Sequence, residues 1–188
     1  INGGTLRLNS GFDNTIPVIA TLASPTLMFL SLNGGATLDI GNKNQTVNGL
    51  TSINPMPGMG GTITGTAGAV FTTTNNSTFG GTLTGGLSFQ RAGNTTTILT
   101  APSTYTGTTT VRGGILQLRD EASILNTSAI TINYGELRWD NFGLNAAANP
   151  TRISPTTPIT INGGLLNISG GGGVDTDITL GTITAVIP

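Results

Sequence analysis

The sequence predicts an all-β fold of the β-solenoid type, with about seven short coils stacked in one domain over residues 1–188. Three observations predict this fold. The composition is rich in glycine and poor in charge, a short phrase recurs along the whole chain, and that phrase alternates with the period of a β-strand. Each coil of a solenoid contacts only its neighbours, so the fold needs a repeated short unit and not one large core.

The composition favours strands over helices. Only 8% of the residues are Asp, Glu, Lys or Arg, against about 25% in ordinary domains, while the chain contains 29 glycines. Solvated helices carry charged residues on their wet face, so strands joined by glycine turns fit this chain better. Intrinsic disorder is the alternative, but the regular recurrence of Leu, Ile, Val and Phe argues against it. The length suits one core and is short for two domains.

The recurring phrase is a glycine, one further residue, and then an apolar–polar–apolar triplet. Clear copies begin at Gly4, Gly85, Gly114, Gly135 and Gly164. Two weaker copies lie between the first and second of these. The first apolar residue of each copy, which we call the anchor, is in order Leu6, Leu38, Ile63, Leu87, Leu116, Leu137 and Leu166. The anchors are 21 to 32 residues apart, which is the length of one coil.

The triplet has a period of two, which places both apolar residues on one face of a strand and the polar residue on the other. All seven middle residues are polar. Stacked coils would therefore bury ladders of like side chains, with glycine at the corner because positive φ costs it little. An antiparallel sandwich is the alternative, but it predicts strands every ~8–12 residues without one recurring corner phrase.

The best-preserved coil resembles a known family. It fits the pattern Y-x-G-x-T-x-V-x-x-G-x-L-x-L through Tyr105, Gly107, Thr109, Val111, Gly114, Leu116 and Leu118. This pattern is similar to the autotransporter-associated β-strand repeat of bacterial passenger domains, and the similarity covers about residues 79–119. The resemblance implies a right-handed parallel β-helix in an extracellular location at the bacterial cell surface, as an adhesin, spacer or scaffold. It implies no catalytic residue.

Charge and residue counts exclude several functions. A net charge of −1 with seven unclustered basic residues leaves nothing to neutralise nucleic acid or hold an anionic membrane. No apolar run approaches the ~18 residues of a membrane span. The chain has no Cys and no His, which removes thiolate and imidazole metal ligands and the commonest general base. We therefore expect no enzyme activity, no cofactor, no nucleic-acid partner and no membrane insertion.

One group of charged residues could bind a ligand. Glu136, Arg138 and Asp140 alternate onto one outer face, and Gln117 and Arg119 are expected one coil below them. Carboxylates grouped on an outer face could bind or cleave a polysaccharide. The simpler interpretation is a solvated face on which opposite charges pair across the ladder. We call Glu136, Arg138 and Asp140 the ligand strip.

A second group is acidic. Asp175 and Asp177, in "GGGGVDTDITLG", resemble the phrasing of calcium-binding β-rolls, but only one copy is present, and a glycine-rich turn is the alternative. We expect no metal site beyond this candidate. Residues 141–158, rich in proline and alanine, are predicted to leave the stack as a loop, and loops on rigid scaffolds often carry binding residues.

The two ends of the sequence match each other. The last residues, "TAVIP", followed by the first, "INGGTLRL", read like the internal "PITINGGLLNI". A second copy would place the next anchor 28 residues after Leu166, within the internal range. The chain begins inside a repeat, so we expect a longer natural context. We predict one unit of a head-to-tail array, either covalent tandem copies or stacked subunits, because heterologous contacts that do not close grow fibres.

The function expected from these observations is an extracellular structural or adhesive β-solenoid that forms a stalk or fibre on a bacterial surface. Its partners would be copies of itself and surface glycans. The alternative is a carbohydrate-binding or carbohydrate-cleaving β-helix that uses the ligand strip.

Overall fold

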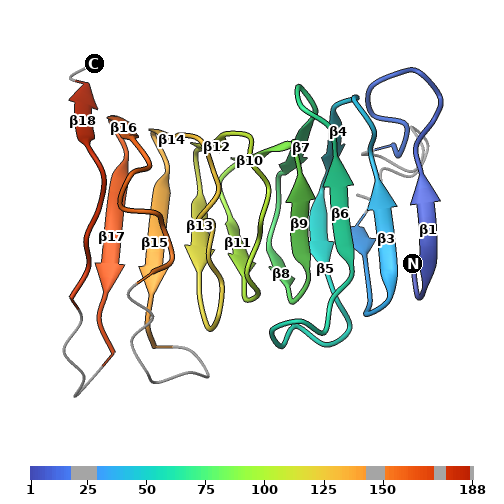
Figure 1. The fold of residues 1–188 in the computed structure, drawn as a ribbon, viewed down its shortest axis with the longest axis horizontal. Coiled ribbons are helices and arrows are strands. Elements are labelled where there is room, and N and C mark those ends of the chain that lie inside the picture. Colours follow the sequence, from blue (N-terminus) through green and yellow to red (C-terminus); the bar gives the residue numbers. More distant parts are fainter. Residues whose placement is uncertain (18–28, 143–150, 172–176, 187–188) are drawn as a thin grey trace.

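The computed structural model describes residues 1–17, 29–142, 151–171 and 177–186. These residues form eighteen β-strands and no helix, as the composition predicted. Every strand pair is parallel, and the one antiparallel contact in this part of the chain is an isolated bridge between Asn33 and Gly60. The strands follow one another along a single axis from β1 to β18 (Figure 1). An antiparallel sandwich is excluded, and the arrangement is compatible with a β-solenoid.

Four sheets contain the strands. The first sheet is built from β1 (Gly4–Arg7), β3 (Ala36–Asp39), β6 (Thr62–Gly65) and β9 (Thr82–Gly85). The second sheet is built from β4 (Gln45–Val47), β7 (Val70–Thr73), β10 (Ser88–Ala92), β12 (Thr109–Arg112), β14 (Ile130–Asn133), β16 (Ile159–Asn162) and β18 (Ile183–Val186). The third is built from β8 (Ser77–Phe79), β11 (Thr96–Leu99), β13 (Ile115–Leu118), β15 (Glu136–Asp140) and β17 (Leu165–Ser169). The fourth pairs β2 (Phe29–Ser31) with β5 (Gly49–Thr51).

Strands that are neighbours along the chain lie in different sheets, and each pairs with a strand of the next repeat. Thr109 of β12 stands opposite Ile130 of β14, which stands opposite Ile159 of β16. Beyond β9 the backbone continues the first sheet, since the Thr106 N–H donates to the Gly85 carbonyl at 2.9 Å. The chain therefore returns to the same sheet once per repeat, and residues far apart in sequence become neighbours.

The core consists of ladders of inward-facing apolar side chains. In the third sheet one ladder runs through Phe79, Leu99, Leu118, Trp139 and Ile168. In the second sheet the rings of Phe71 and Phe89 stack with centroids 6.5 Å apart. All but the terminal rung, Ile168, are buried. The period-two alternation of the sequence is the direct cause, because it turns alternate side chains toward the axis of the stack.

The outer faces explain why the chain is so poor in charge. The outward ladder of the second sheet runs through Thr46, Thr72, Gln90, Thr110, Thr131, Thr160 and Thr184. Neighbouring strands of a sheet lie about 4.8 Å apart, so a like-charged residue on successive rungs would repel its neighbours. Threonine avoids this repulsion and has a high preference for strands. The close spacing of equivalent positions on successive strands thus favours neutral polar residues on the outer face of this sheet.

The coil that resembles the bacterial repeat shows a physical role for each motif position. The Tyr105 hydroxyl is buried and hydrogen-bonds Thr109 Oγ1, so the motif's Tyr and Thr are partners inside the core. A Cβ at Gly107 would lie 2.3 Å from the Leu87 carbonyl oxygen, so only glycine fits there. Gly114 has φ +61° and forms the corner before β13. The remaining three residues, Val111, Leu116 and Leu118, are fully buried.

The anchors form two ladders and not one. Leu6, Leu38 and Ile63 stand opposite one another in the first sheet. A second group, formed by Leu116, Leu137 and Leu166, is in register in the third sheet. Leu87 belongs to neither ladder, because it lies at the corner before β10, and the first-sheet rung above Ile63 is Leu83. Strands of both sheets need a glycine corner and alternating apolar residues. The same phrase therefore occurs in both sheets, and the phrase alone does not indicate which sheet a strand joins.

The predicted loop at residues 141–158 is corrected in part. Residues 143–150 lie outside the described chain. The segment that follows them belongs to the stack, since Arg152 and Ile153 are buried and the Ile124 N–H donates to the Arg152 carbonyl at 2.7 Å. Proline and alanine content therefore overestimated the length of this loop, because Thr157 and its neighbours continue a face of the stack.

Candidate functional site

The three residues of the ligand strip lie on one face of β15. Leu137 and Trp139 of β15 point inward, so Glu136, Arg138 and Asp140 share the outer face. Arg138 Nε donates to Glu136 Oε1 at 2.7 Å. Two side chains of neighbouring strands complete the strip. Asn167 Nδ2 donates to the same Glu136 oxygen at 2.9 Å, and Gln117 Nε2 donates to the Asp140 carboxylate.

The electrostatics of the strip stabilise ionised groups. Burial alone would raise the pKa of Glu136, but hydrogen bonds from Arg138 and Asn167, with the charge of Arg138, outweigh it and lower the pKa below its ordinary value. The hydrogen bond to Glu136 in turn raises the pKa of Arg138. A glycosidic general acid needs a raised carboxyl pKa, which this arrangement does not provide. The strip therefore has the chemistry of a paired charge ladder.

Other predicted site residues are dispersed. Arg119 Nε lies 3.3 Å from Asp120 Oδ2, so Arg119 pairs with Asp120 and not with a carboxylate of the ligand strip. Asp177 is exposed, and Asp175 lies outside the described residues. Across the part of the chain that is described, no group of three acidic side chains could hold a metal ion. The calcium site stays a prediction, because only one of its two residues, Asp177, lies in the described part of the chain.

Sequence reasoning missed two buried arginines. Arg91 and Arg152 are both fully buried. Arg91 follows Phe89 by two residues in β10, and this alternation was the available signal that its side chain points inward. Its guanidinium donates to the Thr73 carbonyl at 3.2 Å and to Thr95 Oγ1 at 2.7 Å. Burial lowers the pKa of Arg91.

Arg152 joins three segments of the chain. Its guanidinium donates to the carbonyl oxygens of Ala122, Asp120 and Asp140 at 2.7, 2.8 and 3.0 Å, and to Asn141 Oδ1 at 3.2 Å. Burial lowers its pKa to about 10, against the opposing charges of Asp140 and Asp120, so the group remains charged at neutral pH. All of these partners are interior to the protein. Arg152 is therefore a structural residue and not a ligand-binding one.

A hollow of about 420 Å³ lies at the corner between the second and third sheets. Arg112, Gly113, Asn133 and Tyr134 line it. Arg112 is exposed, and its side chain forms no hydrogen bond or ion pair with any residue in the described ranges. Tyr134 is 71% exposed. This hollow, which we call the corner hollow, offers a cation, an amide and an aromatic ring to solvent.

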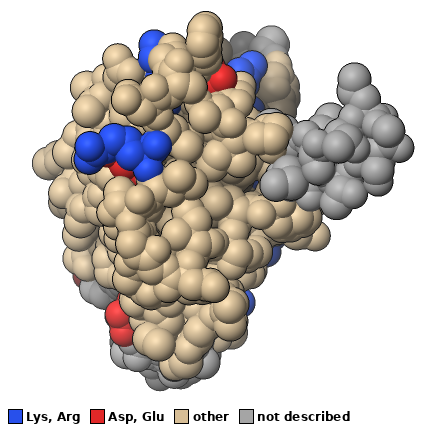
Figure 2. Space-filling view, turned by 90° about the vertical axis from the view of Figure 1, so that its right-hand side faces the viewer, with Lys and Arg blue, Asp and Glu red and all other residues tan. Residues whose placement is uncertain are grey.

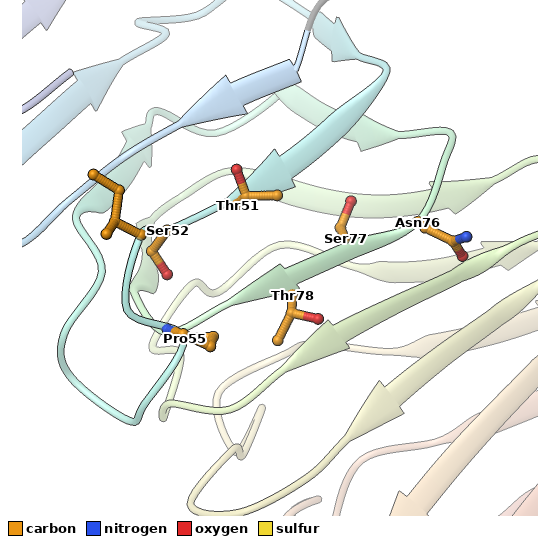
Figure 3. Close-up of a pocket in the computed structure, with 7 residues that line it drawn as sticks. Thr51, Ser52, Pro55, Asn76, Ser77 and Thr78 are labelled. Atoms are coloured by element: carbon orange, nitrogen blue, oxygen red, sulfur yellow. The ribbon is translucent and has the colours of Figure 1, made fainter.

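A second hollow, of about 360 Å³, lies between the end of β5 and β8 (Figure 3). Its hydroxyl groups are largely used by the fold. Ser52 Oγ accepts from the Gly80 N–H at 2.9 Å. Ser77 Oγ accepts from the Leu50 N–H at 2.9 Å and donates to the Asn75 carbonyl at 3.0 Å. These polar groups hold backbone in place, so the second hollow offers less to a ligand than the corner hollow does.

Comparisons of the chain with models of protein families, with curated proteins and with solved structures find no match. Among the described residues, no helix is long and apolar enough to span a bilayer. Functional conclusions therefore depend on the geometry of this chain.

Proposed function

We propose that the protein is an extracellular structural or adhesive β-solenoid of a bacterial surface, a right-handed parallel β-helix of about seven coils that stacks head to tail with further copies. The resemblance of residues 105–118 to the autotransporter-associated repeat supports the handedness and the location. The observation that carries the stacking proposal is the exposure of apolar ladder residues on the edge strands at both ends.

At the β1 end, the ladder residue Leu6 is 42% exposed, whereas Leu38, on the next strand of the same ladder, is fully buried. At the other end, Ile183 of β18 is 46% exposed, whereas Ile159 beside it is 1% exposed. Edge strands also present unpaired N–H and C=O groups, which template association. A further coil placed on either end would bury these side chains as the interior coils are buried.

A second copy of the chain is the occupant that fits these ends best. All strand pairs are parallel, so the end strands β18 and β17 and the end strands β1 and β2 could each be extended by a further parallel strand. The surface seen from the β1 end is mostly uncharged (Figure 2), so little charge has to be desolvated on contact. Full burial of a Leu or Ile stabilises by about 1.5–3 kcal/mol, so each half-exposed ladder residue would contribute about 1 kcal/mol.

The proposal covers separate stacked subunits and covalent tandem copies alike. The internal phrase that the sequence ends imitate runs from β16 in the second sheet to β17 in the third sheet. The first phrase of the chain, β1, lies instead in the first sheet. Any junction between copies, covalent or not, would therefore bring the first-sheet strand β1 against an end formed by the second-sheet strand β18 and the third-sheet strand β17.

Cryo-electron microscopy of the concentrated protein tests the proposal. We expect filaments with an axial repeat of about 34 Å, from about seven coils at ~4.8 Å each. Ile183→Lys and Leu6→Lys should abolish the filaments, because each places a charge on the contact surface. Leu125→Lys is the matched control, since Leu125 is 41% exposed and lies between β13 and β14, in the middle of the stack. A monodisperse monomer at high concentration, or filaments unaffected by Ile183→Lys, would contradict stacking.

Glycan binding is the second candidate function, and the exposed Arg112 and Tyr134 of the corner hollow favour it. Polysaccharide cleavage at the ligand strip is not favoured, because hydrogen bonds and the Arg138 charge keep Glu136 ionised. Reducing-sugar release by wild type and by Glu136→Ala tests cleavage directly, and we expect none from either.

A further inference from the structure

Tyr134 occupies a backbone position that its neighbours in the stack reserve for glycine. Four neighbouring strands of the second sheet, β10, β12, β14 and β16, are followed by Gly93, Gly113, Tyr134 and Gly163 respectively. Their φ angles are +87°, +80°, +56° and +66°. This left-handed region costs a side-chain-bearing residue about 1–2 kcal/mol, and Tyr is a rare occupant of it. The sequence shows the same substitution, since "ITINYGEL" stands against "ITINGGLL".

Burial of the Tyr134 side chain does not offset the cost of its left-handed backbone conformation. Its side chain is 71% exposed, and its ring lies close to Gly163, where an added Cβ would lie 2.8 Å from Cε1. Strained residues persist where the surroundings or a function require them. Tyr134 and Gly113 both line the corner hollow. An exposed aromatic face thus forms a wall of this hollow.

The polar groups of the corner hollow are available to a ligand. The Arg112 guanidinium has no protein partner among the described residues, unlike Arg7, Arg119 and Arg138, which each pair with a carboxylate. Asn133 Oδ1 accepts from Asn162 Nδ2 at 2.6 Å, which orients the Asn133 amide and leaves its NH₂ group free to donate. Among the described residues, no Asp or Glu lines the hollow, so none of them neutralises Arg112 there.

These three groups match an acidic sugar. The apolar C–H face of a pyranose packs on an aromatic ring, and an amide NH₂ donates to a ring hydroxyl. A guanidinium binds a carboxylate with two parallel hydrogen bonds. The hollow has a volume of about 420 Å³ and opens to solvent. We propose that the corner hollow binds a hexuronic acid unit of an acidic polysaccharide, with its ring on Tyr134 and its carboxylate on Arg112.

This inference deepens the adhesive part of the proposed function and does not depend on stacking. The test therefore uses the Ile183→Lys background as well as the wild type, so that loss of filaments and loss of sugar binding are observed separately. The probe is trigalacturonic acid, followed by amide chemical shifts in ¹H–¹⁵N spectra, with maltotriose as the neutral sugar. We expect saturable shifts at Gly113, Asn133 and Tyr134 with the acidic sugar only.

Variants test separately the stacking of the sugar ring on Tyr134 and the binding of its carboxylate by Arg112. Tyr134→Gly should fold at least as well as wild type, because glycine suits the left-handed corner, and should weaken trigalacturonate binding by about tenfold or more. Tyr134→Phe retains the ring and should bind within about threefold of wild type. Arg112→Gln should lose about 10- to 100-fold, the effect of one charge-assisted contact. Arg7→Gln is the matched control, an exposed arginine on a different sheet, and should bind as wild type does.

Three results would overturn the inference. One is the absence of saturable shifts with trigalacturonate. Another is binding that neither Tyr134→Gly nor Arg112→Gln weakens. The third is an equal response of the same amides to inorganic phosphate, which would mark a simple anion site with no use for the ring of Tyr134.

Discussion

Replacement of Arg152 by alanine should cost about 3–5 kcal/mol of unfolding free energy. The side chain is fully buried, and its guanidinium is the donor to three backbone carbonyls and to Asn141 Oδ1. Each buried acceptor left without a donor costs about 1–3 kcal/mol, and partial entry of water and the lost cost of burying a charge reduce the sum. Native proteins have free energies of unfolding of about 5–15 kcal/mol, so the Arg152→Ala variant should be only marginally stable.

The assay is chemical denaturation followed by the fluorescence of Trp139, the only tryptophan of the chain. Trp139 is buried, and its Nε1 donates to the same Asn141 Oδ1 that Arg152 contacts, so the probe reports directly on this region. Arg152→Met keeps most of the side-chain volume and isolates the lost hydrogen bonds from the cavity. Arg7→Ala is the matched control, because Arg7 is 70% exposed and its single pair with Asp39 should contribute less than about 1 kcal/mol.

The structural role of Arg152 would be refuted if Arg152→Ala unfolded within about 1 kcal/mol of wild type, because unsatisfied carbonyls alone should cost more than that. Equal stability of Arg152→Met and wild type would show that the hydrogen bonds contribute nothing net, and that only the packing of the side-chain stem matters.

Two further predictions concern a corner and the ligand strip. Gly114→Ala should lower the free energy of unfolding by more than about 2 kcal/mol, because the added Cβ would lie 2.3 Å from the Thr95 carbonyl oxygen at a left-handed φ of +61°. Thermal unfolding measures this loss, and Gly68→Ala is the control, because Gly68 has φ +91° but open space around an added Cβ. Equal losses in the two variants would show that backbone strain, and not the overlap with Thr95, causes the effect. The lowered pKa of Glu136 contributes stability that is present above its ordinary value of 4.5 and lost as pH falls through the folded-state pKa. Glu136→Gln should remove this acid sensitivity in denaturation at neutral and acidic pH, and an unchanged pH profile would assign the sensitivity to other carboxylates.

The parallel all-β character of the chain could be predicted from the sequence, and so could the composition of the ligand strip. Both follow from local patterns, since alternation sets which face a side chain occupies and a residue at i+2 shares that face. The mutual pairing of Glu136 with Arg138 is of this local kind. The sheet that each phrase joins could not be predicted in this way. Leu6 and Leu116 occupy the same position of the same recurring phrase, yet they stand in different sheets.

By itself, the sequence determined the inward and outward faces of the strands and the need for glycine at the corners, because these depend on a few adjacent residues. Only the tertiary structure decided the two anchor ladders, the interior position of Arg152 and the free guanidinium of Arg112. The physical reason is that each depends on what the neighbouring coil supplies. Carbonyl acceptors from Asp120 and Ala122 make burial of Arg152 possible, and they lie some thirty residues away along the chain.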